Sequence, residues 1–168
     1  WSVWKNSAFG DKANSRYTTI TLEEGSRTVI EKIAGQIVSN VYEKLTLAAD
    51  GTRTLREERK TGTNTAPLIT EHAYFPDTAA EPNKGRIQYT RHPDGTLTRY
   101  TYANVADPVT SGQTALKTTV ETGAVDAAQF APAATGPVPA LTMGTRTETV
   151  TNAFEKVIDA KTWDIASG

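Results

Sequence analysis

Two histidines, His72 and His92, are the residues best suited to metal chemistry, since the chain has no cysteine. His72 follows Glu71, and His92 stands directly before Pro93-Asp94. Two imidazoles on adjoining strands would share a metal ion, but neither lies in a ligand spacing such as HExxH. The sequence therefore predicts no metal site and no cofactor. It favours one structural histidine on a strand and one in a turn.

Adjacent carboxylates occur at Glu23-Glu24 and Glu57-Glu58. On a strand, neighbouring side chains face opposite sides, so neither pair converges on one substrate atom as a hydrolase requires. The sequence also lacks a Gly-rich phosphate loop, a GxSxG nucleophile elbow and a cysteine nucleophile. The chain is therefore predicted not to be an enzyme.

Tryptophans offer a third kind of chemistry, the stacking of an aromatic ring on a ligand. Trp163 lies between Asp159 and Asp164 in sequence, and an aromatic plate with acceptors suits a sugar. Trp1 and Trp4 could add a second aromatic surface near the N-terminus. The competing interpretation, which we favour, makes these rings packing anchors. Trp163 and Trp4 stay candidate ligand contacts.

Composition limits the partners. Lys+Arg (18) and Asp+Glu (19) nearly balance at a net charge of -1, which gives no electrostatic case for nucleic acid. No apolar run approaches the roughly 18 residues of a membrane helix, so no membrane insertion is expected. Because the chain begins at Trp1 rather than Met, we expect a piece of a larger protein. Threonine fills about one position in six, and this β-branched residue favours strands.

Strand patterns recur along the chain with turn signals between them. Asp50-Gly51 and Pro93-Asp94-Gly95 are the clearest turns. The expected strands are Arg16–Leu22, Gln36–Leu47 (with Ile37, Val41, Leu45 and Leu47 on one face), Pro67–Phe75, Arg86–His92, Thr96–Tyr102 and Gln113–Thr122, with alternation again in Thr142–Asn152 and an apolar closing segment, Phe154–Ile165.

Other segments are less strand-like. Asn104–Ser111 and the Ala/Pro-rich stretch 124–139 are predicted loops. A helical turn over Leu55–Lys60, or weak helical spacing in Ile30–Val41, is the open alternative to strands there. The predicted fold is all-β, a single segment over 1–168 in which antiparallel hairpins form a meander and an extended, twisted, repeat-type sheet.

The segment Gly85–Tyr102 reads GRIQYTRHPDGTLTRYTY and describes a hairpin by itself. Gly85 permits a bend, Pro93 fixes φ, Asp94 can cap the turn, and Gly95 supplies positive φ. Thr96, Thr98, Tyr100 and Tyr102 then share one face of the return strand.

This segment resembles the YD repeat of Rhs-type proteins. The matching residues are Gly85, Arg86, Pro93, Asp94, Gly95, Thr98, Tyr100 and Tyr102. Ala103 departs from the pattern, since the family places there the Asp that gives the repeat its name. A weaker echo joins Gly35-Gln36-Ile37 to the Asp50–Thr54 turn.

The resemblance implies an architecture. In Rhs/YD-repeat proteins of bacteria and animals, β-hairpins stack into a spiralling sheet that forms a shell. We therefore expect a non-catalytic structural segment of a secreted or cell-surface protein, whose partners are neighbouring repeats of the same or an identical chain. The alternative is an extracellular carbohydrate- or cell-surface-binding β-sandwich module. Its contacts would be aromatic: Trp1, Trp4, Tyr74, Tyr100, Tyr102 and Trp163.

Overall fold

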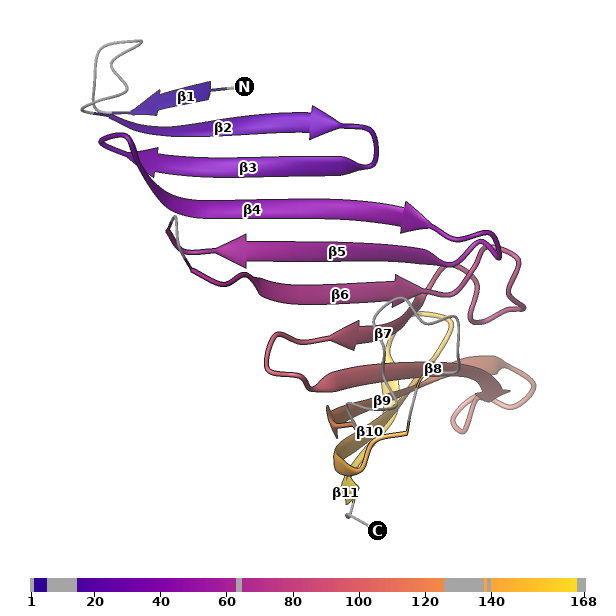
Figure 1. Ribbon diagram of the computed structural model, residues 1–168. Helices are drawn as coiled ribbons and strands as arrows, with labels where there is room; N and C mark the ends of the chain where they lie inside the picture. The colour runs from indigo at the N-terminus through magenta and orange to yellow at the C-terminus, as the bar shows by residue number, and fades with distance from the viewer. Residues whose placement is uncertain (1, 6–14, 63–64, 126–137, 139, 166–168) are drawn as a thin grey trace. The chain divides into compact units, whose positions relative to one another are not determined.

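The computed structural model describes residues 2–5, 15–62, 65–125, 138 and 140–165, and these form eleven strands and no helix (Figure 1). The strands are β1 (Ser2–Lys5), β2 (Arg16–Glu23), β3 (Ser26–Ile33), β4 (Gln36–Leu47), β5 (Arg53–Lys60), β6 (Leu68–Tyr74), β7 (Ile87–Arg91), β8 (Leu97–Ala106), β9 (Thr114–Ala124), β10 (Met143–Thr151) and β11 (Val157–Ile165). The predicted all-β antiparallel meander is thus confirmed, and the sheet does not close into a barrel.

The chain divides into two compact units. The first comprises Trp1–Leu47 and Thr54–Glu71, and the second comprises Ala48–Arg53 and His72–Gly168. The first unit contains β1 to β4 and nearly all of β5, and the second contains β7 to β11. Strand β6 contributes to both.

In the first unit, the strands β1 to β4 each pair antiparallel with the next one along the chain, and β5 lies beside β4 in the same sheet. Ile20, Val29 and Val41 stand opposite one another on β2, β3 and β4, so β-branched side chains form a row across one face. Between β3 and β4, Ala34 (φ 46°) and Gly35 (φ 76°) make a two-residue turn of the I′ kind, whose twist suits a hairpin.

In the second unit, β8, β9 and β10 are paired along nearly their whole lengths. One face carries Thr98, Thr122 and Thr145 in a single lateral row, because each stands opposite the next. The register between β10 and β11 shifts at Val150/Thr151, which is a β-bulge beside the last turn.

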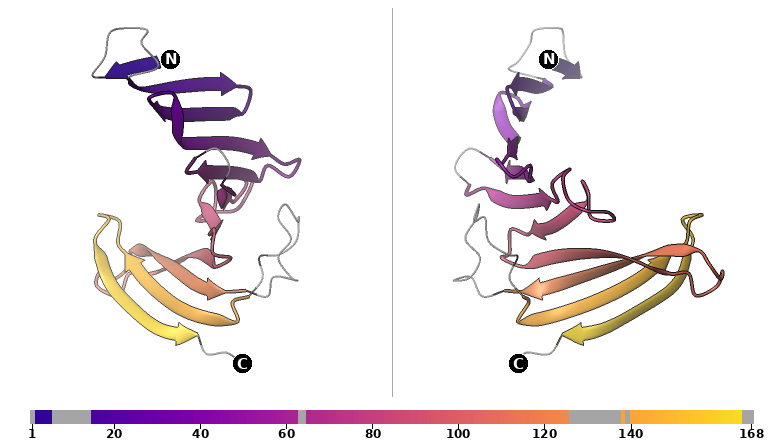
Figure 2. Two further views of the ribbon diagram at one scale, coloured as in Figure 1. Left: turned by 60° about the vertical axis from the view of Figure 1, so that its left-hand side comes forward. Right: turned by 90° about the vertical axis from the view of Figure 1, so that its right-hand side faces the viewer.

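Little apolar surface is buried in either unit. Among the described residues, the buried apolar side chains are those of Tyr17, Ala73, Leu97, Ala115 and Val150. Within each unit the described strands lie in one layer (Figure 2). Large apolar side chains are exposed along both units, namely Leu22, Ile33, Val38, Leu45, Leu47, Leu68, Val109, Met143, Phe154, Val157 and Trp163. Cross-strand pairs therefore carry much of the stabilisation that a central core supplies elsewhere.

The structure decides one open alternative and corrects two expectations. Leu55–Lys60 and Ile30–Val41 are strand and turn rather than the alternative helix, since neighbouring strands satisfy their backbone groups. The predicted loop Asn104–Ser111 is wrong in its first part, because β8 continues to Ala106 against β9. A register shift places Ile37 opposite Lys32, and this interrupts the face that Ile37 was expected to share with Val41. Most of the predicted loop 124–139 lies outside the described residues.

Candidate functional site

One turn recurs with the same hydrogen bonds at three hairpins. In His92–Thr96, Gly95 N–H donates to the His92 carbonyl (3.0 Å) and His92 N–H donates to the Thr96 carbonyl (2.9 Å). Ala48–Thr52 has the same pair at 3.0 and 2.9 Å, and Asn152–Lys156 has it at 3.0 and 3.0 Å. The fourth residue of each has positive φ: Gly51 (84°), Gly95 (86°) and Glu155 (59°). The predicted echo of the Gly95 turn at Asp50-Gly51 is therefore a real likeness of backbone geometry.

An aspartate fixes each of the first two turns. The Asp94 carboxylate accepts hydrogen bonds from the Thr96 N–H (2.9 Å) and hydroxyl (2.8 Å), and these hold the pKa of Asp94 below its ordinary value. Asp50 accepts from the Thr52 N–H (2.9 Å), and its pKa is lowered for the same reason. Pro93 precedes Asp94 in the exposed part of its turn. These residues thus shape hairpins, as the sequence predicted.

Gly85 has a positive φ of 66°, which favours glycine, and its Cα lies close to an ion pair. A Cβ on Gly85 would lie 3.3 Å from both the Arg53 guanidinium and the Asp77 carboxylate, which bond to each other at 3.3 Å. Arg53 also lies over the Tyr74 ring, with 5.9 Å between its guanidinium carbon and the ring centroid. Arg53 and Asp77 were not expected from the sequence, because no motif links them to Gly85.

Arg86 and Tyr102, two further motif residues, contact each other. The Arg86 guanidinium carbon lies 5.2 Å from the centroid of the Tyr102 ring, a cation–π geometry. Phe75 meets the same ring edge-on, with 6.4 Å between centroids. Burial raises the pKa of the Tyr102 phenol, although Arg86 opposes that shift. The structure thus gives both residues a packing role.

The two histidines form hydrogen bonds with threonine hydroxyls in the second unit. His92 Nε2 lies 2.9 Å from the Thr98 hydroxyl, which lies 3.0 Å from the Thr122 hydroxyl. His72 Nδ1 lies 2.9 Å from the hydroxyl of Thr90, which stands opposite Thr98. Both histidines therefore bond to threonines on adjacent strands. In the part of the chain that the structure describes, no group of three or more His, Cys, Asp or Glu side chains is placed to hold a metal ion.

A charged row crosses the opposite face of β8 to β11. The Glu121 carboxylate accepts a hydrogen bond from Arg99 Nε at 2.8 Å. It also lies 3.8 Å from the Arg146 guanidinium. Arg146 also bonds to Glu148, lowering the pKa of that carboxyl, and lies 5.2 Å from the Trp163 ring centroid. The row of charged side chains therefore ends with Arg146 packed on the Trp163 ring.

Other candidate residues do not gather into a site. Asp164 stands opposite Thr145, whereas Trp163 stands opposite Arg146, so the two adjacent side chains point to opposite faces. Asp159 pairs with Lys161 at 3.0 Å. The sugar patch that the sequence offered as the less favoured interpretation would therefore be split across the sheet. Trp4 lies in β1 opposite Tyr17, and Trp1 lies outside the described residues.

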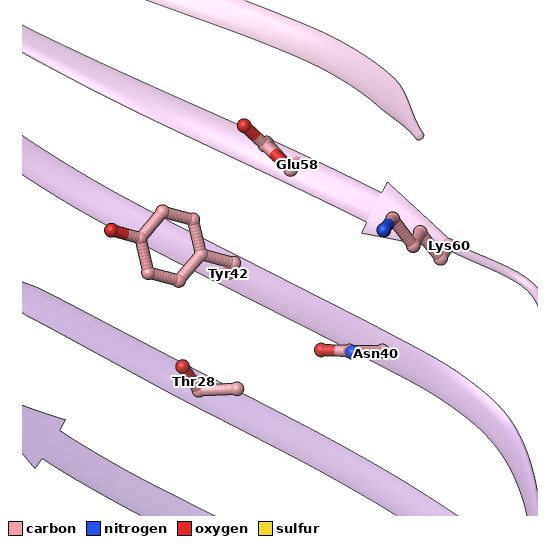
Figure 3. A pocket seen from close by; sticks show the side chains of 5 residues that line it. All are labelled: Thr28, Asn40, Tyr42, Glu58 and Lys60. Carbon is pink, nitrogen blue, oxygen red and sulfur yellow. The ribbon is translucent and has the colours of Figure 1, made fainter. Parts of the chain in front are cut away.

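The adjacent carboxylates of Glu57 and Glu58 face opposite sides of β5, as predicted. Glu57 forms a salt bridge with Arg59 at 3.1 Å on one face of β5. Glu58 forms one with Arg56 at 2.9 Å on the other face. Glu58 also lines a hollow in the first unit with Thr28, Asn40, Tyr42 and Lys60 (Figure 3). No sequence motif marked this group, because its members come from three strands.

No family model, curated protein or solved structure matches the chain. None of the described residues belongs to a helix able to cross a membrane.

Proposed function

We propose that the chain is a non-catalytic structural segment of a secreted or cell-surface protein of the Rhs/YD-repeat type. Its hairpins add edge to edge to neighbouring repeats of the same or an identical chain, and so build a shell or scaffold. The observation that carries the proposal is the recurrent turn of Ala48–Thr52, His92–Thr96 and Asn152–Lys156, which three hairpins share.

Two further features support this assignment. Among the described strands, β1 pairs only with β2 and β11 only with β10, so each leaves one row of backbone groups for another strand. The buried apolar set is small while many large apolar side chains are exposed. A hairpin of a repeat protein has this character, because its neighbours complete the burial.

The motif residues also act as scaffold residues. Gly85 gives room to an ion pair, Arg86 packs on Tyr102, and Asp94 fixes a turn. Each of these roles shapes the backbone or its packing, which supports a structural segment. The alternative of a β-sandwich module is less well supported, because the described strands follow one another in one sheet rather than in two.

Light scattering on a size-exclusion column tests the proposal. We expect the average mass of the chain to rise between a low and a high concentration, because open edges pair. Ala160→Lys places a charge on the edge strand β11 and should reduce the rise. Ala153→Lys is the matched control, since it adds the same charge to an exposed alanine in the adjacent turn. A compact monomer at both concentrations would contradict edge-to-edge assembly.

A further inference from the structure

The hollow of the first unit gathers polar side chains from three neighbouring strands. Thr28 of β3 stands opposite Tyr42 of β4, and Asn40 lies two residues from Tyr42, so these three share one face. Glu58 and Lys60 come from β5, the next strand, and line the same hollow (Figure 3). The hollow measures about 240 Å³ and is partly open to solvent. This is somewhat smaller than the roughly 300–1,000 Å³ of typical small-molecule sites, so the ligand must be small.

Most of these polar groups have no partner among the residues that the structure describes. Asn40 Oδ1 is buried and accepts no hydrogen bond, which costs free energy unless a ligand or water supplies a donor. Among the described residues, the hydroxyls of Thr28 and Tyr42 and the ammonium of Lys60 also lack a hydrogen-bond or ion-pair partner. Only Glu58 is engaged, by Arg56 at 2.9 Å.

The chemistry of the hollow suits a sugar ring. Asn40 and Glu58 offer acceptor oxygens, and the hydroxyls of Thr28 and Tyr42 can donate or accept. Sugar hydroxyls also do both, so they can satisfy this mixed set. The Tyr42 ring adds a flat apolar surface on which the C–H face of a pyranose can pack.

The charge of the hollow selects among sugars. Lys60 is a half-buried cation without a carboxylate partner in the described part of the chain, while the charge of Glu58 is offset by Arg56. An anionic group on the ligand would pair with Lys60. We propose that this hollow binds a saccharide residue that carries a carboxylate, with the carboxylate on Lys60 and the ring hydroxyls on Asn40, Thr28 and Tyr42. This inference does not depend on edge-to-edge assembly.

Isothermal titration calorimetry of the whole chain with trigalacturonate tests the proposal. The neutral trisaccharide of galactose is the comparison ligand. We expect saturable binding of trigalacturonate and binding at least about tenfold weaker for the neutral sugar, since one charge-assisted hydrogen bond is lost. Absence of binding to trigalacturonate, or equal binding of both sugars, would overturn the proposal.

Three variants locate the site. Lys60→Met removes the cation, and Asn40→Leu removes the unpartnered amide while keeping a similar volume, so the sheet should survive both. We expect each to weaken binding by about tenfold or more. Lys44→Met is the matched control, because Lys44 is exposed on the same face of β4 but does not line the hollow.

The control variant should bind within about twofold of the unmodified chain, as expected for an exposed, solvent-screened charge. If Lys44→Met and Lys60→Met weaken binding equally, the attraction is a general charge effect and the proposed site is wrong. Retained binding in Asn40→Leu would also overturn the assigned contacts. Light scattering on the same samples reports assembly separately, so the failure of this inference leaves the proposed function untouched.

Discussion

Gly123 and Gly144 stand opposite each other on β9 and β10, where the two backbones approach too closely for any side chain. A Cβ on Gly123 would lie 1.9 Å from the Met143 carbonyl oxygen, and one on Gly144 would lie 2.1 Å from the Thr122 carbonyl oxygen. The clashing atoms are backbone, so a side chain at either position requires the strands to separate.

Gly123→Ala should therefore lower the free energy of unfolding by more than about 2 kcal/mol, because strand separation disrupts the paired ladder. Urea denaturation followed by circular dichroism measures it. Gly112→Ala is the control: Gly112 has φ 78° but meets no atom within 4 Å. That change should cost only about 1–2 kcal/mol of backbone strain. An equal effect at both positions would contradict the close approach.

The charged row on β8 to β10 should contribute to stability through Glu121. This side chain is only 12% exposed and receives two arginines, Arg99 and Arg146. Glu121→Gln keeps the shape but removes the charge between them, and we expect a loss of about 1–2 kcal/mol in the free energy of unfolding.

The control variant is Glu57→Gln, which weakens the ion pair with Arg59. This pair is more exposed, since the Glu57 side chain is 30% exposed and that of Arg59 is 57% exposed. Solvent screens such a pair, so the loss should stay below about 0.5 kcal/mol. The two variants are compared by their urea midpoints at low and high salt. Equal losses would mean that the row adds no more than an ordinary surface ion pair.

In the recurrent turn, exchanging glycine and glutamate at the fourth position should change stability in opposite directions at two hairpins. Glu155 occupies with φ 59° the position that glycine fills at Gly51 and Gly95. Glu155→Gly should raise stability by about 0.5–1 kcal/mol, because relief of left-handed strain outweighs the added flexibility of the unfolded chain. Gly95→Glu should lower it by about 1–2 kcal/mol. Thermal melts of both variants test the pair. Destabilisation by Glu155→Gly would show that the turns are not equivalent.

Acid should weaken the two aspartate turns. Since the folded pKa of Asp94 is lowered, its carboxylate stabilises the fold above the unfolded-chain pKa, and that contribution disappears as the pH falls through the folded pKa. We expect the urea midpoint to fall between pH 7 and about pH 3, and to fall less for Asp94→Asn. Asn keeps an acceptor oxygen but does not titrate in this range. Asp164→Asn, outside the turns, is the control, and an unchanged acid response in Asp94→Asn would contradict the assignment.

Local chemistry explains why so much of the fold could be predicted. The bounds of β4 match the expected Gln36–Leu47, and the Asp94-Gly95 turn has the expected geometry, because turn residues and β-branched alternation act over a few neighbours. Strand β3 was missed as a separate strand, since the Ala34-Gly35 turn carries a weak signal: alanine seldom adopts positive φ.

Relationships between distant strands were beyond prediction. The Glu121 row depends on register, and the hollow around Asn40 combines three strands. Nothing in the single sequence fixes which charge faces which. The orientation of Asp164 is a related case: it is adjacent to Trp163 in sequence but lies on the other face of the sheet.

Residue-resolved amide hydrogen exchange at low concentration tests the open-edge account most directly. Each amide of β9 has a paired strand on both sides, β8 and β10, whereas β11 has one described neighbour. We expect the strongest protection in Leu116–Glu121 and much weaker protection in alternate amides of Val157–Ile165, with the difference shrinking at high concentration as edges pair. Protection of β11 equal to that of β9 at low concentration would mean that the edge is covered within a single chain, and would contradict edge-to-edge assembly.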